Sequence, residues 1–298
     1  MQDLNWDDLR VFKAIADTGQ IGKAAHMLHL DPTTLSRRLR RLESQVETPL
    51  FERTRDGQTL TEAGERLLAK VEEMDMAASS ISEQLSSHLG LSGTLRISVS
   101  EGFGSQFLTR HLAEFLASHP NMKVDLVANS GFLSPSKREA DIAVMLSRPR
   151  SGPVICQKLA DYRLRLYASR DYLKANGTPA HIGDLAGRHR LIGYVPDLIY
   201  SPELNYLGEF HGQLEPQVRS SSINAQMQLI EQGVGIGVLP CFIGDINPAL
   251  VSICPDTSTT RTFWLVTHQD TNNLLRIKEG KAWLRDCVAQ QRRGLMPA

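Results

Sequence analysis

Six arginines and a group of small hydroxyl side chains lie within one short stretch of the chain, from residue 32 to residue 55. Three glutamates accompany the six arginines, which gives a local net charge of +3, whereas residues 1–31 carry three basic and five acidic side chains, a net −2. Guanidinium groups bind phosphates and guanine edges, and small hydroxyls let a helix approach base edges closely. The chemistry open to this stretch is therefore nucleic-acid binding, even though the whole chain has zero net charge.

Three short helices are expected to position these groups. Apolar residues at helical spacing begin at Trp6, and Gly19 ends that helix. A second amphipathic stretch covers residues 21–28. Asp31 followed by Pro32 marks the start of the third helix, because Asp caps a helix and Pro suits its first position. The apolar stripe of the third helix is Leu35, Leu39, Leu42 and Val46. Two helices joined by a tight turn form a helix-turn-helix.

The candidate DNA contacts lie on this third helix and on a hairpin expected over residues 51–60. Asp56-Gly57 predicts a two-residue turn, and a basic hairpin behind a recognition helix is a wing that reaches phosphates or the minor groove. The predicted contacts are Pro32, Thr33, Thr34, Ser36, Arg37, Arg38, Arg41, Arg53 and Arg55. Among them Arg41 and the two hairpin arginines are expected to neutralise phosphates. A solvated helix face is the alternative for the arginines, and the cap and the hydroxyls favour DNA.

A heptad pattern follows the hairpin. Thr61 can cap a helix, and apolar residues then recur at spacings of four, three, four, three and four. These candidate dimerisation residues are Leu67, Val71, Met74, Ala78, Ile81 and Leu85. Because helix-turn-helix units usually act in pairs on two half-sites, the seam favours a dimer helix. The alternative is a helix that packs on its own domain.

From Thr94 onward the pattern changes to alternating strands and helices. Strands are expected near residues 95–99, 122–128, 141–146, 164–168, 191–192, 235–240 and 263–266, and helices near 107–116, 223–232 and 277–288. Such alternation predicts mostly parallel sheets. Ligands of such sheets bind beyond the carboxyl ends of the strands.

Several runs carry a family resemblance. Residues 24–43 read AAHMLHLDPTTLSRRLRRLE, and PLFER at 49–53 and LTEAG at 60–64 follow. These runs resemble the winged helix-turn-helix of the LysR-type transcriptional regulators. The family usually has Gln where this sequence has Pro32, so a side-chain amide contact to a base is not available there. In the second half, GTLRI, ADIAV, LYAS and GVGIGVLP also resemble the family.

The resemblance implies an α/β fold class with three parts. Residues 1–60 would form the winged helix-turn-helix, 61–90 a linker and dimerisation helix, and 91–298 an effector domain like a type II periplasmic binding protein. Lobe one of that domain would hold 91–162 and 267–298, and lobe two 163–266. The implied partners are double-stranded DNA, a small-molecule effector, RNA polymerase and further copies of the chain, as a dimer and then a homotetramer.

The effector would lie between the lobes, near the ends of strands. The predicted effector-binding residues are Ser100, Glu101, Gly102, Asn129, Ser130, Tyr194, Ser222 and Asn224. The start of a helix with nearby hydroxyls favours binding of an anion. A buried carboxylate at residue 101, by contrast, requires a cation or a hydrogen-bond donor as its partner. A plain capping role is the alternative for each of these residues. Two further runs, 162–167 and 196–202, are distinctive, but no chemistry is assigned to them.

Other classes of function find little support. Residues 102–107 almost match a dinucleotide fingerprint, but Phe107 replaces the third glycine. His26 and His29 alone do not make a metal site, and no spacing pairs a nucleophile with a base, so we expect neither cofactor, metal nor catalytic residues. The four separated cysteines indicate free thiols in a reduced compartment. No apolar run approaches a membrane span, and the acidic start predicts no signal peptide, so a cytoplasmic protein is expected.

The main hypothesis is thus a sequence-specific regulator of transcription that responds to an effector in the cleft. One rival is a ligand-binding α/β protein with enzymatic turnover in the cleft and a fused DNA-binding unit. A second rival is a scaffold that has lost DNA recognition, for which Pro32 is the only hint.

Overall fold

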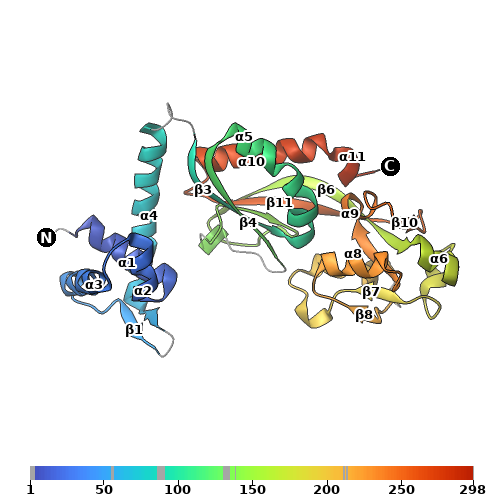
Figure 1. Ribbon diagram of the computed structural model, residues 1–298, viewed down its shortest axis with the longest axis horizontal. Coiled ribbons are helices and arrows are strands. Elements are labelled where there is room, and N and C mark those ends of the chain that lie inside the picture. Colours follow the sequence, from blue (N-terminus) through green and yellow to red (C-terminus); the bar gives the residue numbers. More distant parts are fainter. Residues whose placement is uncertain are drawn as a thin grey trace. The chain divides into compact units, whose positions relative to one another are not determined.

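The computed structural model describes residues 4–54, 57–85, 91–129, 135–137, 139–210, 212 and 214–297. The chain divides into two compact units, Met1–Leu85 and Ser86–Ala298, which Figure 1 colours from blue to red along the sequence. Each unit has its own hydrophobic core. Within the described residues, no helix is both long and apolar enough to cross a membrane.

The first unit is a three-helix bundle with a hairpin and a long final helix. Its elements are α1 (Trp6–Thr18), α2 (Ile21–Leu28), α3 (Pro32–Val46), β1 (Phe51–Arg53), β2 (Gln58–Leu60) and α4 (Glu62–Leu85). The predicted ends of the helices are confirmed. Gly19 ends α1 with a φ of +66°, and the Asp31 side chain accepts a hydrogen bond from the Thr33 amide at 2.8 Å. Pro32 occupies the first turn of α3.

The hairpin is held to the helices by packing and by one close backbone approach. The rings of Phe12 and Phe51 lie 5.3 Å apart, and the amide of Gln58 donates to the carbonyl of Gly19 at 2.8 Å. Gly57 has a φ of +143°, and a Cβ at this position would lie 2.3 Å from the Gly19 oxygen. A glycine is therefore required where the hairpin meets the end of α1.

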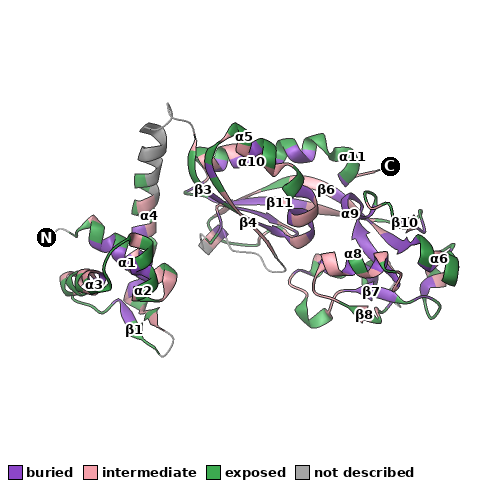
Figure 2. Ribbon diagram, in the orientation of Figure 1, coloured by how far each residue is buried: buried purple, intermediate pink, exposed green. Residues whose placement is uncertain are grey.

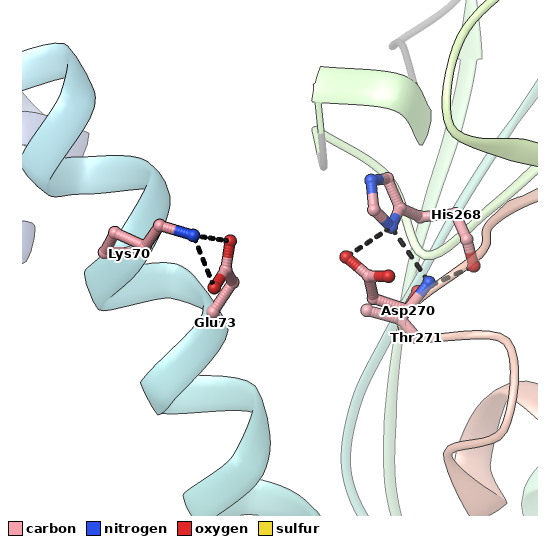
Figure 3. Close-up of polar contacts among 5 residues, drawn as sticks. All are labelled: Lys70, Glu73, His268, Asp270 and Thr271. Atoms are coloured by element: carbon pink, nitrogen blue, oxygen red, sulfur yellow. Dashed lines mark hydrogen bonds and ion pairs between the residues drawn. The ribbon is translucent and has the colours of Figure 1, made fainter.

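The described positions of the predicted heptad seam on α4 fall into a buried group and an exposed group. Val71 is 1% exposed and belongs to the core of the first unit, and half-buried Leu67 packs against the same core. The first two seam positions thus follow the alternative interpretation, in which the helix packs on its own domain. Met74 is 49% exposed and Ala78 is also exposed. The side chains of Ile81 and Leu85 lie outside the described residues. Figure 3 shows a nearby exposed pair on α4, Lys70 with Glu73, whose Nζ–Oε1 distance is 3.0 Å.

The second unit is built on one extended sheet. Its strands are β3 (Ser92–Ser100), β4 (Asn121–Asn129), β5 (Ile142–Met145), β6 (Val154–Ser169), β7 (Leu191–Gly193), β8 (Val218–Arg219), β9 (Ile236–Pro240), β10 (Leu250–Ile253) and β11 (Thr259–His268). Its α-helices are α5 (Leu112–Ser118), α6 (Arg170–Asn176), α7 (Tyr206–Phe210), α8 (Ile223–Glu231), α9 (Cys241–Gly244), α10 (Leu275–Gln290) and α11 (Arg292–Leu295). The strand order is β4-β3-β5-β11-β6-β9-β7-β8, with β10 also paired to β6.

The prediction of mostly parallel sheets is wrong. Strands β3, β4 and β5 pair in parallel, as do β7, β8 and β9, but β6 and β11 make antiparallel pairs with each other and with all their other neighbours. The expected helix over 107–116 also differs, because a π-helical turn (Phe103–Phe107) and a 3₁₀ turn (Leu108–Arg110) precede α5. The sheet is not mostly parallel because two long strands, β6 and β11, run antiparallel to their neighbours between its two parallel ends.

Strands β6 and β11 join the two ends of the sheet. We call β3–β5 with α5 and α10 lobe one, and β7–β10 with α6 and α8 lobe two; both are visible in Figure 1. The predicted lobe boundaries, after residues 162 and 266, lie inside β6 and β11. Figure 2 shows buried strands beneath more exposed helices in both lobes. The space between the lobes therefore lies beside two strands that both lobes share.

Candidate DNA interface and effector cleft

One face of α3 is buried and the opposite face is exposed and basic. Leu35, Leu39 and Leu42 are 0–6% exposed and pack into the core of the first unit. Thr33, Arg37 and Arg40 follow each other at spacings of four and three, so they lie on the opposite face, and all three are exposed. Within the described part of the chain neither arginine has a polar partner. This face is free to meet an external anion.

Arg40 is not among the DNA contacts predicted from the sequence. The signal was present, because residue 40 lies opposite the leucine stripe at helical spacing. Ser36 has a local role as well, since its hydroxyl donates to the carbonyl of Pro32 at 2.9 Å. Thr34 is half-buried, at the edge of the exposed face.

Arg41 is engaged inside the first unit. Its Nε and Nη2 donate to the two carboxylate oxygens of Asp8, each at 2.5 Å, and the Asp8 side chain is 0% exposed. The hydrogen bond to Asp8 raises the pKa of Arg41. A two-point ion pair of this kind fixes α3 to α1. Arg38 lies 3.5 Å from the carboxylate of Asp7, a looser and more exposed pair.

The wing contributes one described cation. Arg53 is exposed at the end of β1, and the amide of Thr54 donates to the carbonyl of Gly57 at 2.8 Å, which closes the hairpin. Arg55 lies outside the described residues. Among the described arginines of α3 and the wing, those that remain available for DNA are therefore Arg37, Arg40 and Arg53, with Arg38 beside them.

In the second unit, Glu101 joins the two lobes. Its carboxylate accepts hydrogen bonds from the Ser222 hydroxyl at 2.7 Å, the Ile223 amide at 3.0 Å and the Asn224 side-chain amide at 2.9 Å. Glu101 follows β3 of lobe one, and the three donors lie at the start of α8 in lobe two. The chain's own carboxylate thus occupies the anion position that a helix N-terminus offers. We call these four residues the clasp.

The predicted cleft residues fall into three groups. Ser100, Glu101, Gly102 and Tyr194 line a narrow space between the lobes. Ser222 and Asn224 belong to the clasp, in which their side chains donate hydrogen bonds to Glu101. Ser130 and the side chain of Asn129 lie outside the described residues.

Aromatic side chains fill the space beside the clasp. The rings of Tyr162 and Phe263 stack 4.1 Å apart, and Phe103 lies 4.4 Å from Phe263. The volume that remains is about 20 Å³, much less than the roughly 300–1,000 Å³ of ordinary ligand sites. The lobes are therefore closed at this point.

A separate and larger cavity lies in lobe two. Its volume is about 500 Å³, and it lies among β7, β8 and the segment 196–208. Tyr194 lines both this cavity and the narrow cleft. The unassigned run 196–202 of the sequence forms part of the cavity wall, whereas Tyr162 from the other run lines the cleft.

Glycines near the clasp have a packing role. A Cβ on Gly104 would lie 2.4 Å from that of Ala128 and 2.7 Å from a methyl of Val99. A Cβ on Gly102 would meet side chains of Ile223 and Ile243 at 3.0 Å. These contacts explain the partial dinucleotide fingerprint without a nucleotide.

Within the described residues, no three potential metal ligands lie close together. His268 contacts Asp270 at the end of β11, with 3.6 Å between Nδ1 and Oδ2 (Figure 3). The Thr271 hydroxyl donates to the backbone oxygen of His268 rather than to its ring, so the group closes a turn. The four cysteines form no disulfides, and burial raises the pKa of Cys287 to about 12.

Both units match families of known proteins. Residues 88–288 match the LysR substrate binding domain, and residues 6–65 match the bacterial regulatory helix-turn-helix proteins of the lysR family. The Mau operon transcriptional activator of Paracoccus denitrificans is 29% identical over 240 residues, which cover 80% of this chain and 81% of that protein. The HTH-type transcriptional regulator CrgA of Neisseria meningitidis serogroup C is 27% identical over 286 residues, 92% of this chain and 94% of CrgA.

Solved structures share the fold. The structure of CrgA has a TM-score of 0.59 at 23% identity, and it covers 96% of this chain and 99% of that one. Full-length LysG from Corynebacterium glutamicum with bound effector Arg has a TM-score of 0.62 at 17% identity, with 96% and 99% covered. At these identities the likeness concerns the fold alone.

Proposed function

This chain belongs to the LysR-type transcriptional regulators, and from that premise we propose how it reads DNA. The recognition surface is the exposed face of α3, with Thr33 and Ser36 near base edges and Arg37, Arg38 and Arg40 near bases and phosphates. Arg53 and Arg55 of the wing contact the neighbouring backbone. Pro32 and Thr34 sit at the start of α3, where they set its approach to the groove.

The observation that carries this proposal is the pair of unpartnered cations, Arg37 and Arg40, on the face opposite the buried leucines. A guanidinium without a protein partner is fully available to a phosphate or a guanine. Arg41, by contrast, is engaged by Asp8, so its role in DNA binding is to hold α3 in place. The family consists of transcription regulators and not of enzymes.

The assembly that we propose is a dimer through α4, and a tetramer of two such dimers. Met74 and Ala78 are exposed apolar positions on this helix, and Ile81 and Leu85 continue their spacing. A second copy of α4 would cover them, and the paired first units would contact two half-sites. Contact with RNA polymerase in the cytoplasm would follow from binding near a promoter.

Control by an effector is proposed to act through the lobes of the second unit. The clasp holds the lobes together through the carboxylate of Glu101, and the cleft beside it is full. An effector that enters among the predicted cleft residues must therefore separate the lobes or replace the clasp bonds. LysG was solved with bound effector Arg, which supports a small-molecule effector for this fold.

The test compares two neighbouring arginines in DNA binding. Fluorescence anisotropy would measure binding of the full chain to the DNA upstream of its gene and to random DNA of equal length, across a salt series. We expect tighter binding to the upstream DNA. Arg40→Ala should lower the salt slope by about 0.9 for each lost phosphate contact, whereas Arg41→Ala should leave the slope unchanged where the protein stays folded.

The outcomes separate the alternatives. Equal binding of both DNAs, with a steep salt dependence, would contradict sequence-specific recognition of that DNA. An unchanged slope in Arg40→Ala would contradict the assignment of the α3 face. Met74→Glu should shift the dimer toward monomer in sedimentation, and Lys70→Glu, an exposed change on the same helix, serves as its control.

A further inference from the structure

The cavity in lobe two has the size of a ligand site. It encloses about 500 Å³, within the roughly 300–1,000 Å³ that small-molecule sites occupy. Its walls come from the end of β7, the segment 196–208, residues 214–219, α8 and β9. It lies within one lobe, so a ligand can occupy it while the clasp of Glu101 remains closed.

The walls are apolar and aromatic, with neutral donors among them. The apolar part consists of Ile192, Ile199, Leu204, Leu207, Leu214 and Val238, together with three prolines. Tyr194, Tyr200 and Tyr206 add aromatic surface. Burial raises the pKa of Tyr200 to about 12, and also raises those of Tyr194 and Tyr206. All three hydroxyls therefore stay protonated near neutral pH, and the interior suits an aromatic group rather than a charge.

Two side chains of opposite charge line the same cavity. Arg219 and Glu215 line this cavity and are both exposed, so both residues lie at its mouth. The Nε of Arg219 donates to the Pro216 carbonyl at 3.1 Å, and this bond orients the guanidinium. Within the described residues no ion pair joins the side chains of Arg219 and Glu215, so both charges remain available to a ligand.

We propose that this cavity binds an aromatic α-amino acid, with its ring among the three tyrosines, its carboxylate at Arg219 and its ammonium at Glu215. One molecule of this class satisfies the apolar interior and both charges at the mouth. A simple carboxylic acid leaves Glu215 unmatched, and a simple amine leaves Arg219 unmatched. The inference rests on the proposed regulatory function, because it assigns the effector to a site distinct from the interlobe cleft.

The cavity shares a wall with the cleft. Tyr194, Tyr200, Leu204 and Tyr206 line both spaces, and the carboxylate of Glu101 acts electrostatically on Tyr194 and Tyr200. A ring that enters the cavity must displace or fix these tyrosines. Binding of a ligand in the cavity therefore changes the position or mobility of the tyrosines that lie beside the clasp.

The test uses the full chain with L-phenylalanine, L-tyrosine and L-tryptophan as probes in isothermal titration calorimetry. We expect at least one of the three to bind. For that probe, the analogue without the ammonium group and the analogue without the carboxylate should each bind about tenfold more weakly, the usual effect of one lost charge-assisted hydrogen bond. Arg219→Gln should abolish the preference over the analogue without the carboxylate.

A pair of neighbouring substitutions locates the site. Ile199→Trp fills the cavity and should abolish binding, whereas Leu198→Trp, at an exposed position outside the lining, should leave it intact. Circular dichroism would confirm that both variants are folded. Binding that survives Ile199→Trp, or no binding by any of the three probes, would overturn the inference. DNA binding by the same samples is measured separately, so this failure is distinguishable from failure of the proposed function.

Discussion

Replacing Glu101 by glutamine should loosen the second unit, because it weakens the clasp without changing the size of the side chain. The amide oxygen can still accept from Ser222 and Asn224. The new NH₂ group would face the amide of Ile223, so the bond at 3.0 Å is lost. The negative charge at the start of α8 is lost as well, although it is favourable there.

The magnitude follows from these two losses. A hydrogen bond to a charged group contributes about 1.5–3 kcal/mol, and Glu101 is half-buried, so solvent screens part of its charge. We expect the free energy of unfolding of the second unit to fall by about 1.5–2.5 kcal/mol. Urea denaturation followed by tryptophan fluorescence can measure this, since two of the three tryptophans, Trp264 and Trp283, lie in that unit.

A matched control separates the clasp from a general effect of removing a carboxylate. Asp171 lies in the first turn of α6 in the same unit, where its side chain is 91% exposed and pairs with the exposed side chain of Lys174. Asp171→Asn should change the free energy of unfolding by less than about 0.5 kcal/mol. If Glu101→Gln changes stability no more than this control, the three hydrogen bonds do not hold the lobes together.

Three further outcomes follow from particular contacts. Arg41→Ala should lower the denaturation midpoint of the first unit more than Arg40→Ala does, because it leaves the buried carboxylate of Asp8 unpaired; equal midpoints would refute this. Burial lowers the pKa of His189 below its ordinary 6.5, so the unfolded chain binds its proton first and stability is lost as the pH falls below about 6.5; urea titrations should show a smaller acid loss in His189→Gln. Gly104→Ala should destabilise the second unit by about 1–3 kcal/mol by overpacking, measurable by calorimetry, with Gly183→Ala, which meets nothing within 4 Å, as the control.

The helices of the first unit could be predicted because local signals decide them. Asp31 with Pro32 and the glycine at position 19 fix helix ends through the backbone of a few neighbouring residues. The long strand β6 could not be predicted in full. Its first half includes Gln157, Lys158 and Asp161 and shows no regular alternation of burial, so only its pairing with β11 across the sheet reveals it.

The candidate sites show the same division between local and long-range information. The sequence placed Glu101, Ser222 and Asn224 at the ends of elements, and the structure brings them together. It could not indicate that the carboxylate of Glu101 would itself occupy the start of α8, since these residues are 121–123 positions apart. The ion pair between Arg41 and Asp8 could not be predicted either, because the two residues lie on different helices, 33 positions apart. The helical pattern alone indicated only that Arg41 is exposed.

The clasp also limits how strongly any effector can act through it. If a ligand in the lobe-two cavity binds better when the clasp is open, the free energy of the clasp sets the largest possible change in affinity. The part of the clasp that Glu101→Gln removes, about 1.5–2.5 kcal/mol, corresponds to roughly 10- to 70-fold in affinity. Glu101→Gln should therefore bind the aromatic amino acid more tightly, by no more than this factor, and calorimetry on the same protein can measure it. An affinity that does not change would show that the tyrosine wall does not couple the cavity to the clasp.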